Sequence, residues 1–149
     1  MDSKDHRNEL KRFFKSFVHA GRGIWETART ERNFQFHAAA ACAVLICGFL
    51  VELSMIEWMI IFLLIGGMFS LELLNTAIEH TVDLITDKHH PLAKAAKDAA
   101  AGAVCVFAVI SCIIGLLIFF AKAVMAENSY IYFTFLEMGV KKSARLCKI

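Results

Sequence analysis

The chain has 149 residues, of which 58% are hydrophobic and 20% are charged, and its formal net charge is only +2. Soluble domains usually contain about 45–50% apolar and about 25% charged residues, so this composition indicates an integral membrane protein. It excludes a secreted disulfide scaffold, a nucleic-acid-binding module and a disordered tail, and the single proline argues against a loop-rich β fold.

The first predicted element is an amphipathic helix over residues 8–30, inside an N-terminal surface segment of residues 1–33. Its apolar residues recur near helical spacing, with basic residues between them. A basic amphipathic helix that carries Phe and Trp usually lies in the membrane interface, although an ordinary soluble amphipathic helix is the alternative. The segment lacks the apolar stretch of a signal peptide. Its apolar residues include Leu10, Phe13, Phe14, Phe17, Ile24 and Trp25.

Three apolar segments follow, at about 34–51, 58–71 and 99–121. The third contains 23 residues without a charge, enough to cross a hydrocarbon core of about 30 Å as a helix. The second has an uncharged run of only 14 residues, but its helical pattern continues through Asp83, which indicates a membrane helix that extends into a polar zone. We therefore predict an all-α membrane domain with three transmembrane helices over residues 34–121.

Lysine and arginine are distributed unevenly around these segments. The N-terminal arm carries eight, the loop near residues 52–57 none, and the loop before the third segment three. Basic residues favour the cytoplasmic side, so we expect the N-terminus and the second loop in the cytoplasm. The C-terminal tail, residues 122–149, should then lie outside although it is also basic.

A polar stripe marks the end of the second apolar segment. Glu72, Asn75, Glu79 and Asp83 are spaced by three, four and four residues, which places them on one helix face over about 16 Å. Ionisable residues beside hydrocarbon are functional candidates by default. A solvated helix end is the alternative, and it suits Asp83 better than Glu72.

Further polar groups are expected at the same inner interface. Lys94, Lys97 and Asp98 share one face at the start of the third span, and Glu31 precedes the first span. Carboxylates can hold Mg²⁺, lysine can neutralise phosphate, and a carboxylate can accept a hydroxyl proton. Together they are the parts of a phosphoryl-transfer site, where a lipid hydroxyl could meet a soluble donor. The P-loop and protein-kinase motifs are absent from the sequence.

Two long motifs resemble a known family. They are E-x-x-N-T-A-I-E-x-x-V-D at Glu72–Asp83 and H-P-L-A-K-A-A-K-D at His90–Asp98, supported by R-G-I at Arg22–Ile24 and T-E-R-N at Thr30–Asn33. They are similar to the small prokaryotic diacylglycerol kinase and undecaprenol kinase family over roughly residues 10–120, most of all to the undecaprenol kinase branch of Gram-positive bacteria.

The resemblance implies a homotrimer with three spans per protomer and active sites at protomer boundaries. It also implies Mg²⁺-dependent transfer of the ATP γ-phosphate to a lipid alcohol at the cytoplasmic face of a bacterial plasma membrane. Undecaprenol would give undecaprenyl phosphate, a carrier lipid for cell-wall precursors. Diacylglycerol, giving phosphatidic acid, is the alternative acceptor.

The resemblance also assigns roles by matching position. Glu72 resembles the general base and, with Asp83, would contact the lipid substrate. Glu31 and Glu79 resemble the Mg²⁺ ligands. Asn75, Lys97 and Asp98 would position the phosphates and the base. The residues expected to contact ATP include Lys97, Asp98, Glu31 and Glu79. Less specific matches to the nucleotide region, for which a plain surface role is the alternative, are Arg12, His19, Lys88, His89 and His90.

Two features depart from the family pattern. Members usually end soon after the third span, whereas this chain continues through residues 122–149. Position 37 is His, where the diacylglycerol branch tends to carry an acid, which favours undecaprenol.

Two hypotheses from other classes compete with the kinase. A small proton-coupled transporter predicts a carboxylate near the bilayer midplane and a pathway to both faces. Here the acids cluster at one end, which favours the kinase. The second hypothesis, a structural membrane adaptor, does not explain why polar residues share one helix face beside hydrocarbon.

Overall fold

The computed structural model describes the backbone of residues 3–86 and 88–146, with side chains for residues 9, 11–86 and 88–126. This part of the chain contains four helices and no strand, as the prediction of an all-α protein requires. The helices are α1 (Ser3–Thr30), α2 (Arg32–Leu50), α3 (Met55–Ile85) and α4 (Pro91–Leu146).

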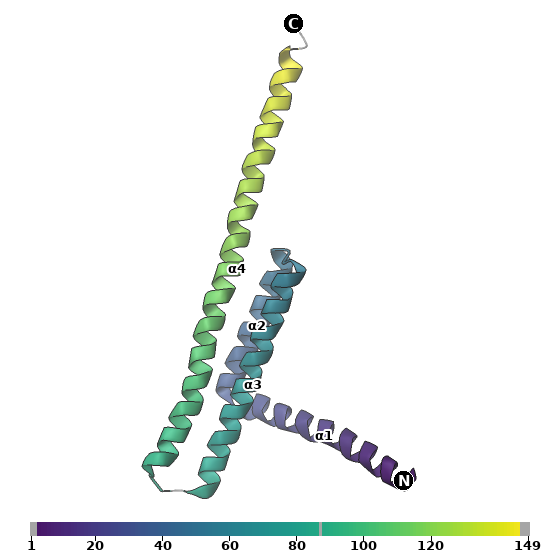
Figure 1. Cartoon of the computed structure of the whole chain (residues 1–149). Coiled ribbons are helices and arrows are strands. Elements are labelled where there is room, and N and C mark those ends of the chain that lie inside the picture. The colour runs from purple at the N-terminus through teal and green to yellow at the C-terminus, as the bar shows by residue number, and fades with distance from the viewer. Residues whose placement is uncertain (1–2, 87, 147–149) are drawn as a thin grey trace.

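Helix α1 projects sideways from the other three helices (Figure 1). The break lies at Glu31, whose backbone is extended with φ −92° and ψ 115°. The side-chain amide of Gln35 donates to the carbonyl oxygens of Ala28 and Arg29, both at 3.1 Å, and so satisfies two acceptors at the end of α1. The sequence-predicted helix over residues 8–30 is thus present, and it starts earlier, at Ser3.

Helices α2 and α3 form a hairpin with a tight turn. Ser54 caps α3 and exchanges hydrogen bonds with Glu57, a capping box that fixes the helix start. Gly48 is buried against this turn, and a Cβ on it would lie only 2.9 Å from Leu53 and from Trp58. A glycine is therefore needed where the hairpin closes.

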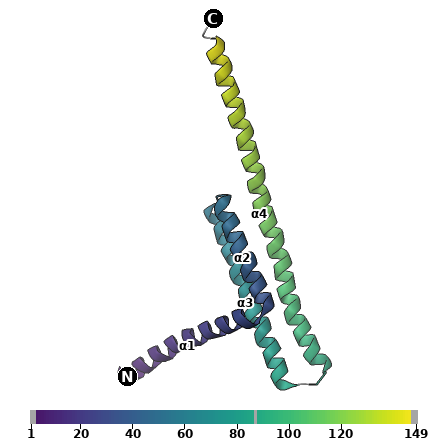
Figure 2. The ribbon, with the colours of Figure 1, turned by 180° about the vertical axis from the view of Figure 1, so that it is seen from behind.

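Helix α3 contacts both α2 and α4, and its contact with α4 is the more extensive one. Figure 2 shows α4 running along one side of the hairpin of α2 and α3. The rings of Phe34 and Phe69 stack with centroids 4.9 Å apart, joining α2 to α3. At Gly67 a Cβ would overlap the ring of Phe107, so α3 and α4 approach closely at this point. Among the residues whose side chains the structure describes, few apolar ones are buried: Phe34, Leu53, Ile61 and Met68.

Within the described residues, three helices are long and apolar enough to cross a membrane: Arg32–Leu50, Met55–Ile85 and the Pro91–Ala126 part of α4. They match the three apolar segments expected from the sequence. Most of their large apolar side chains are exposed in the single chain. The 31 residues of α3 rise about 46 Å, which exceeds the roughly 30 Å hydrocarbon core. The helix therefore has room for a polar end outside the apolar layer.

Helix α4 is 56 residues long and continues without a break from the third span to Leu146. It extends far beyond the hairpin of α2 and α3 (Figure 1). Where it passes the hairpin, the Nζ of Lys122 lies 3.1 Å from Oε2 of Glu57 and donates to the carbonyl oxygen of Glu52 at 3.1 Å. The helix is therefore continuous at residue 122, where the sequence analysis placed the start of the C-terminal tail.

Candidate active site

Glu72 is the most deeply buried large side chain in the described part of the chain, with 2% of its surface exposed. It lies in the middle of α3, at the level where α2 begins. The Nε2 atom of His37, on α2, lies 3.2 Å from Oε1 of Glu72. The two atoms are not aligned as a hydrogen bond, and Oε1 has no hydrogen-bond partner. A buried carboxylate oxygen without a partner is costly, which marks Glu72 as a candidate for function.

The next turns of α3 carry two more of the sequence-predicted polar groups. The amide Nδ2 of Asn75 donates to Oε1 of Glu79 at 2.8 Å, while Oδ1 of Asn75 is buried without a partner. Glu31 and Glu79 both lie within electrostatic reach of Glu72. Glu31, Glu72, Asn75 and Glu79, together with His37, form what we call the carboxylate cluster.

The carboxylate cluster fits a divalent cation in the donor types that it offers. Glu31 occupies the N-cap position of α2, yet its side chain makes no capping hydrogen bond, so its oxygens are not engaged there. Glu79 supplies a second carboxylate. Mg²⁺ is usually bound through one or two carboxylates plus substrate phosphates and water. Among the described residues no three His, Cys, Asp or Glu side chains converge into a metal cage, and a two-carboxylate Mg²⁺ site does not require one.

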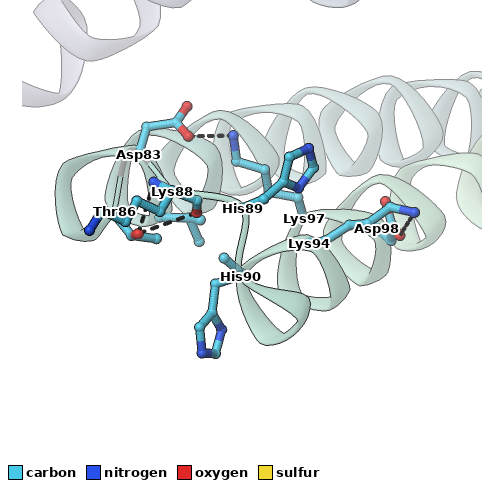
Figure 3. A pocket seen from close by; sticks show the side chains of 10 residues that line it. Asp83, Thr86, Lys88, His89, His90, Lys94, Lys97 and Asp98 are labelled. Carbon is cyan, nitrogen blue, oxygen red and sulfur yellow. Dashed lines mark hydrogen bonds and ion pairs between the residues drawn. The ribbon is translucent and has the colours of Figure 1, made fainter.

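A second group of predicted residues lines a cavity of about 440 Å³ between the end of α3 and the start of α4, which we call the turn cavity. Figure 3 shows the Nζ of Lys97 directed at Asp83, across from one helix to the other. Their Nζ and Oδ1 atoms are 2.5 Å apart, and Lys94 and Asp98 face each other at 4.0 Å. The predicted residues along its wall are Asp83, Lys88, His89, His90, Lys97 and Asp98.

The turn cavity is suited to anions. Lys88, Lys94 and Lys97 contribute three cationic groups against the carboxylates of Asp83 and Asp98, and two histidines lie beside them. Lysine ammonium groups are common phosphate partners. The cavity is open, and its lysines are on the surface of the helices or the connecting turn, so a phosphate chain could reach them from water.

An apolar groove of about 400 Å³ runs between α2, α3 and α4 and reaches His37. Its walls include Val44 from α2, Met68 from α3 and Gly115 from α4. The groove thus passes close to the side chain that faces Glu72. A long apolar chain with a polar end would match this combination of surfaces.

The structure separates the sequence-predicted residues into groups. Glu31, Glu72, Asn75 and Glu79 come together in the carboxylate cluster, and the six residues named above line the turn cavity. Glu72 and Asp83 are eleven positions apart on α3, about 16 Å along the helix. Arg12 and His19 are exposed on α1 and belong to neither group.

Sequence reasoning missed two contributors. It did not identify His37 as the neighbour of Glu72, because that contact joins two helices and leaves no local spacing pattern. It placed Lys94 on the phosphoryl-transfer face with Lys97 and Asp98 but gave it no individual role at the nucleotide.

Residues 18–119 match the sequence model of a family described as prokaryotic diacylglycerol kinase. The undecaprenol kinase of Bacillus subtilis is 97% identical over 122 residues, which cover 82% of this chain and 99% of that protein. A diacylglycerol kinase from Synechocystis is 41% identical over 101 residues, which cover 67% of this chain and 58% of that protein.

Proposed function

The chain belongs to the prokaryotic diacylglycerol kinase family and is thus a lipid kinase, and we propose that its acceptor is undecaprenol. The observation that carries this proposal is the 97% identity to an undecaprenol kinase over nearly all of that protein's length. Diacylglycerol is the weaker candidate, since the relative named for it is 41% identical. The transporter and adaptor hypotheses gain no support from a family of kinases.

The buried Glu72 suits the role of general base. In our proposal the alcohol places its hydroxyl beside the Glu72 carboxylate and its isoprenoid chain along the apolar groove. Glu72 accepts the hydroxyl proton while the alcohol oxygen forms a bond to the γ-phosphorus of ATP. The bond between that phosphorus and the β–γ bridging oxygen breaks, and ADP leaves. Burial of this carboxylate would exclude the water that otherwise competes for the phosphoryl group.

The phosphate donor would be held by residues of both groups. Lys97 and its neighbours in the turn cavity offer cationic partners for the phosphates, and Asn75 has a buried amide oxygen still unpaired. Glu31 and Glu79 are the proposed Mg²⁺ ligands. The cation, when bound, supplies charge neutralisation for the transferring phosphoryl group.

We place the active site on the cytoplasmic side and propose a homotrimer. The basic N-terminal arm and second loop support the orientation, and the exposed apolar faces of the membrane helices support contact with lipid or further protomers. Helix α1 exposes Phe13, Phe17 and Trp25, in keeping with a position in the membrane interface. Sites at protomer boundaries would let Arg12 and His19 meet a nucleotide that their own chain does not bring near them.

The test is phosphate transfer from labelled ATP in mixed detergent micelles, with undecaprenol and diacylglycerol offered separately and in competition. We expect Mg²⁺-dependent transfer and a preference for undecaprenol of at least about tenfold, equal to about 1.4 kcal/mol in transition-state free energy. A preference for diacylglycerol would keep the mechanism and refute the acceptor. No transfer to either alcohol by folded protein would refute the proposal as a whole.

A further inference from the structure

The contact between His37 and Glu72 crosses from α2 to α3 at the end of the apolar groove. The separation of 3.2 Å between Nε2 and Oε1 is within hydrogen-bond distance, although the two groups are not aligned as a hydrogen bond. Catalytic hydrogen bonds are often loose before the substrate binds and tighten in the complex. The Glu72 side chain is 2% exposed and that of His37 is 21% exposed, and His37 lines the groove, whereas Glu72 is not among its lining residues.

The polar neighbours of Glu72 on its own helix are engaged elsewhere. The amide nitrogen of Asn75 donates to Glu79, and the hydroxyl of Thr76 donates to the backbone carbonyl of Glu72 at 3.0 Å, not to its carboxylate. The other charged groups that act on Glu72 from nearby are the acids Glu31 and Glu79, which repel it. Imidazole Nε2 can donate a proton both in the cation and in one neutral tautomer. His37 is therefore suited to hold this carboxylate.

We propose that His37 is a positioning residue for the general base Glu72. Its Nε2–H group binds Oε1 of the carboxylate and fixes its rotation, so that the second oxygen is presented to the hydroxyl of the lipid alcohol. This inference rests on the proposed function, because it needs Glu72 to accept the hydroxyl proton. It adds a residue from α2 to a proposed catalytic site in which the general base comes from the polar stripe on α3.

The imidazole also belongs to the wall of the apolar groove. The same side chain thus adjoins both the carboxylate and the space proposed for the lipid chain. A reaction that depends on one carboxylate orientation should slow when the donor is removed, since a misplaced base loses much of its rate advantage. Nucleotide contacts in the turn cavity lie further along α3 and should not change.

The experiment compares two variants. His37→Leu replaces the imidazole with an apolar side chain of similar bulk, and His37→Gln provides a terminal amide that can donate to Glu72. Both are measured on the full chain in micelles with undecaprenol, Mg²⁺ and varied ATP. For His37→Leu we expect kcat to fall about 10- to 100-fold, the range for losing one hydrogen bond to a charged group. The KM for ATP should stay within about twofold, and His37→Gln should recover kcat to within about fivefold of the unsubstituted chain.

A matched control is His80→Leu, because His80 is an exposed histidine of α3 outside the groove and the turn cavity. Its kcat should stay within about twofold of the unsubstituted chain. If the Leu variant fails to fold, His37→Asn replaces it, since the shorter amide cannot reach Glu72.

Equal kcat for His37→Leu and the unsubstituted chain would overturn the positioning role. An equal fall in kcat for His37→Gln and for the variant that cannot donate to Glu72 would also overturn it. That result would indicate that only the shape of histidine matters. These results differ from failure of the proposed function, in which the unsubstituted chain itself would not phosphorylate undecaprenol.

Discussion

Glu72 is the residue on which the proposed chemistry depends. It is buried, it faces an imidazole from another helix, and its backbone carbonyl accepts from Thr76. A charged carboxylate is costly to bury in such surroundings, so a purely structural role would be better served by an apolar residue. Its burial therefore argues for a role in proton transfer.

Glu72→Gln should lower kcat about 10²- to 10⁴-fold, the usual contribution of a general base. The KM for ATP should change little, because the amide keeps the shape of the side chain. Steady-state phosphorylation of undecaprenol at varied ATP measures both. Glu26→Gln, an exposed position on α1, is the matched control and should retain full activity. Near-normal kcat in the Glu72→Gln variant would show that another group accepts the proton.

The sequence predicted which residues lie close together where those residues belong to the same helix. Glu72, Asn75 and Glu79 were expected on one face, and the Asn75–Glu79 hydrogen bond confirms that these two are close. The sequence did not predict the contacts between different helices. The ion pair of Asp83 with Lys97 and the approach of His37 to Glu72 depend on how the helices pack, which hydrophobic periodicity does not specify. The catalytic and ligand roles of these residues remain predictions.

At the scale of elements, the contact between α3 and α4 depends on a residue without a side chain. Gly67→Ala would place a methyl group into the ring of Phe107, and overpacking of this kind usually costs about 1–3 kcal/mol. Gly66→Ala is a sharp control, because nothing lies within 4 Å of a Cβ at Gly66.

We expect the Gly67 variant to unfold in detergent at a lower temperature than the unsubstituted chain. The Gly66 variant should be unchanged or slightly more stable, because alanine favours a helix over glycine by up to about 1 kcal/mol. Thermal unfolding followed by circular dichroism distinguishes them. The same unfolding temperature for both variants would mean that Phe107 moves aside at little cost.

The hydrophobic pattern predicted which elements form but not where they end. The expected second span began at Trp58, whereas α3 begins at Met55, because the capping box of Ser54 and Glu57 starts the helix before the apolar run. Likewise α4 begins at Pro91, eight residues before the uncharged segment. Proline is favoured in the first turn of a helix, where its missing N–H has no partner to lose. Apolar runs thus mark the part of a helix within lipid rather than the whole helix.

For the whole molecule, the question is whether residues after the third span matter. The family match ends at residue 119, and the alignment with the Bacillus subtilis protein, which covers 99% of that protein, takes in 82% of this chain. Truncation after Phe120 should therefore leave kcat within about twofold. It removes the Lys122–Glu57 contact, and ion pairs of this kind contribute about 0–1 kcal/mol.

The measurement is undecaprenol phosphorylation together with the oligomer mass in detergent, determined by size-exclusion chromatography with light scattering. Lys122→Ala in the full chain separates loss of the ion pair from loss of the remaining tail. A truncated chain that no longer assembles, while Lys122→Ala does, would show that the extended part of α4 is needed for the assembly.

The break between α1 and α2 has a mechanical consequence. Glu31 is the residue between these two helices, so any change in the angle between α1 and the other helices would turn about it. The arc that a point travels in such a rotation grows with its distance from the pivot. Phe13 and Phe14, several turns away, would sweep through a wide arc as the surface beneath them undulates, whereas the carboxylate of Glu31 would hardly be displaced. A position at this break would thus keep one acid of the carboxylate cluster almost still during such a movement of α1.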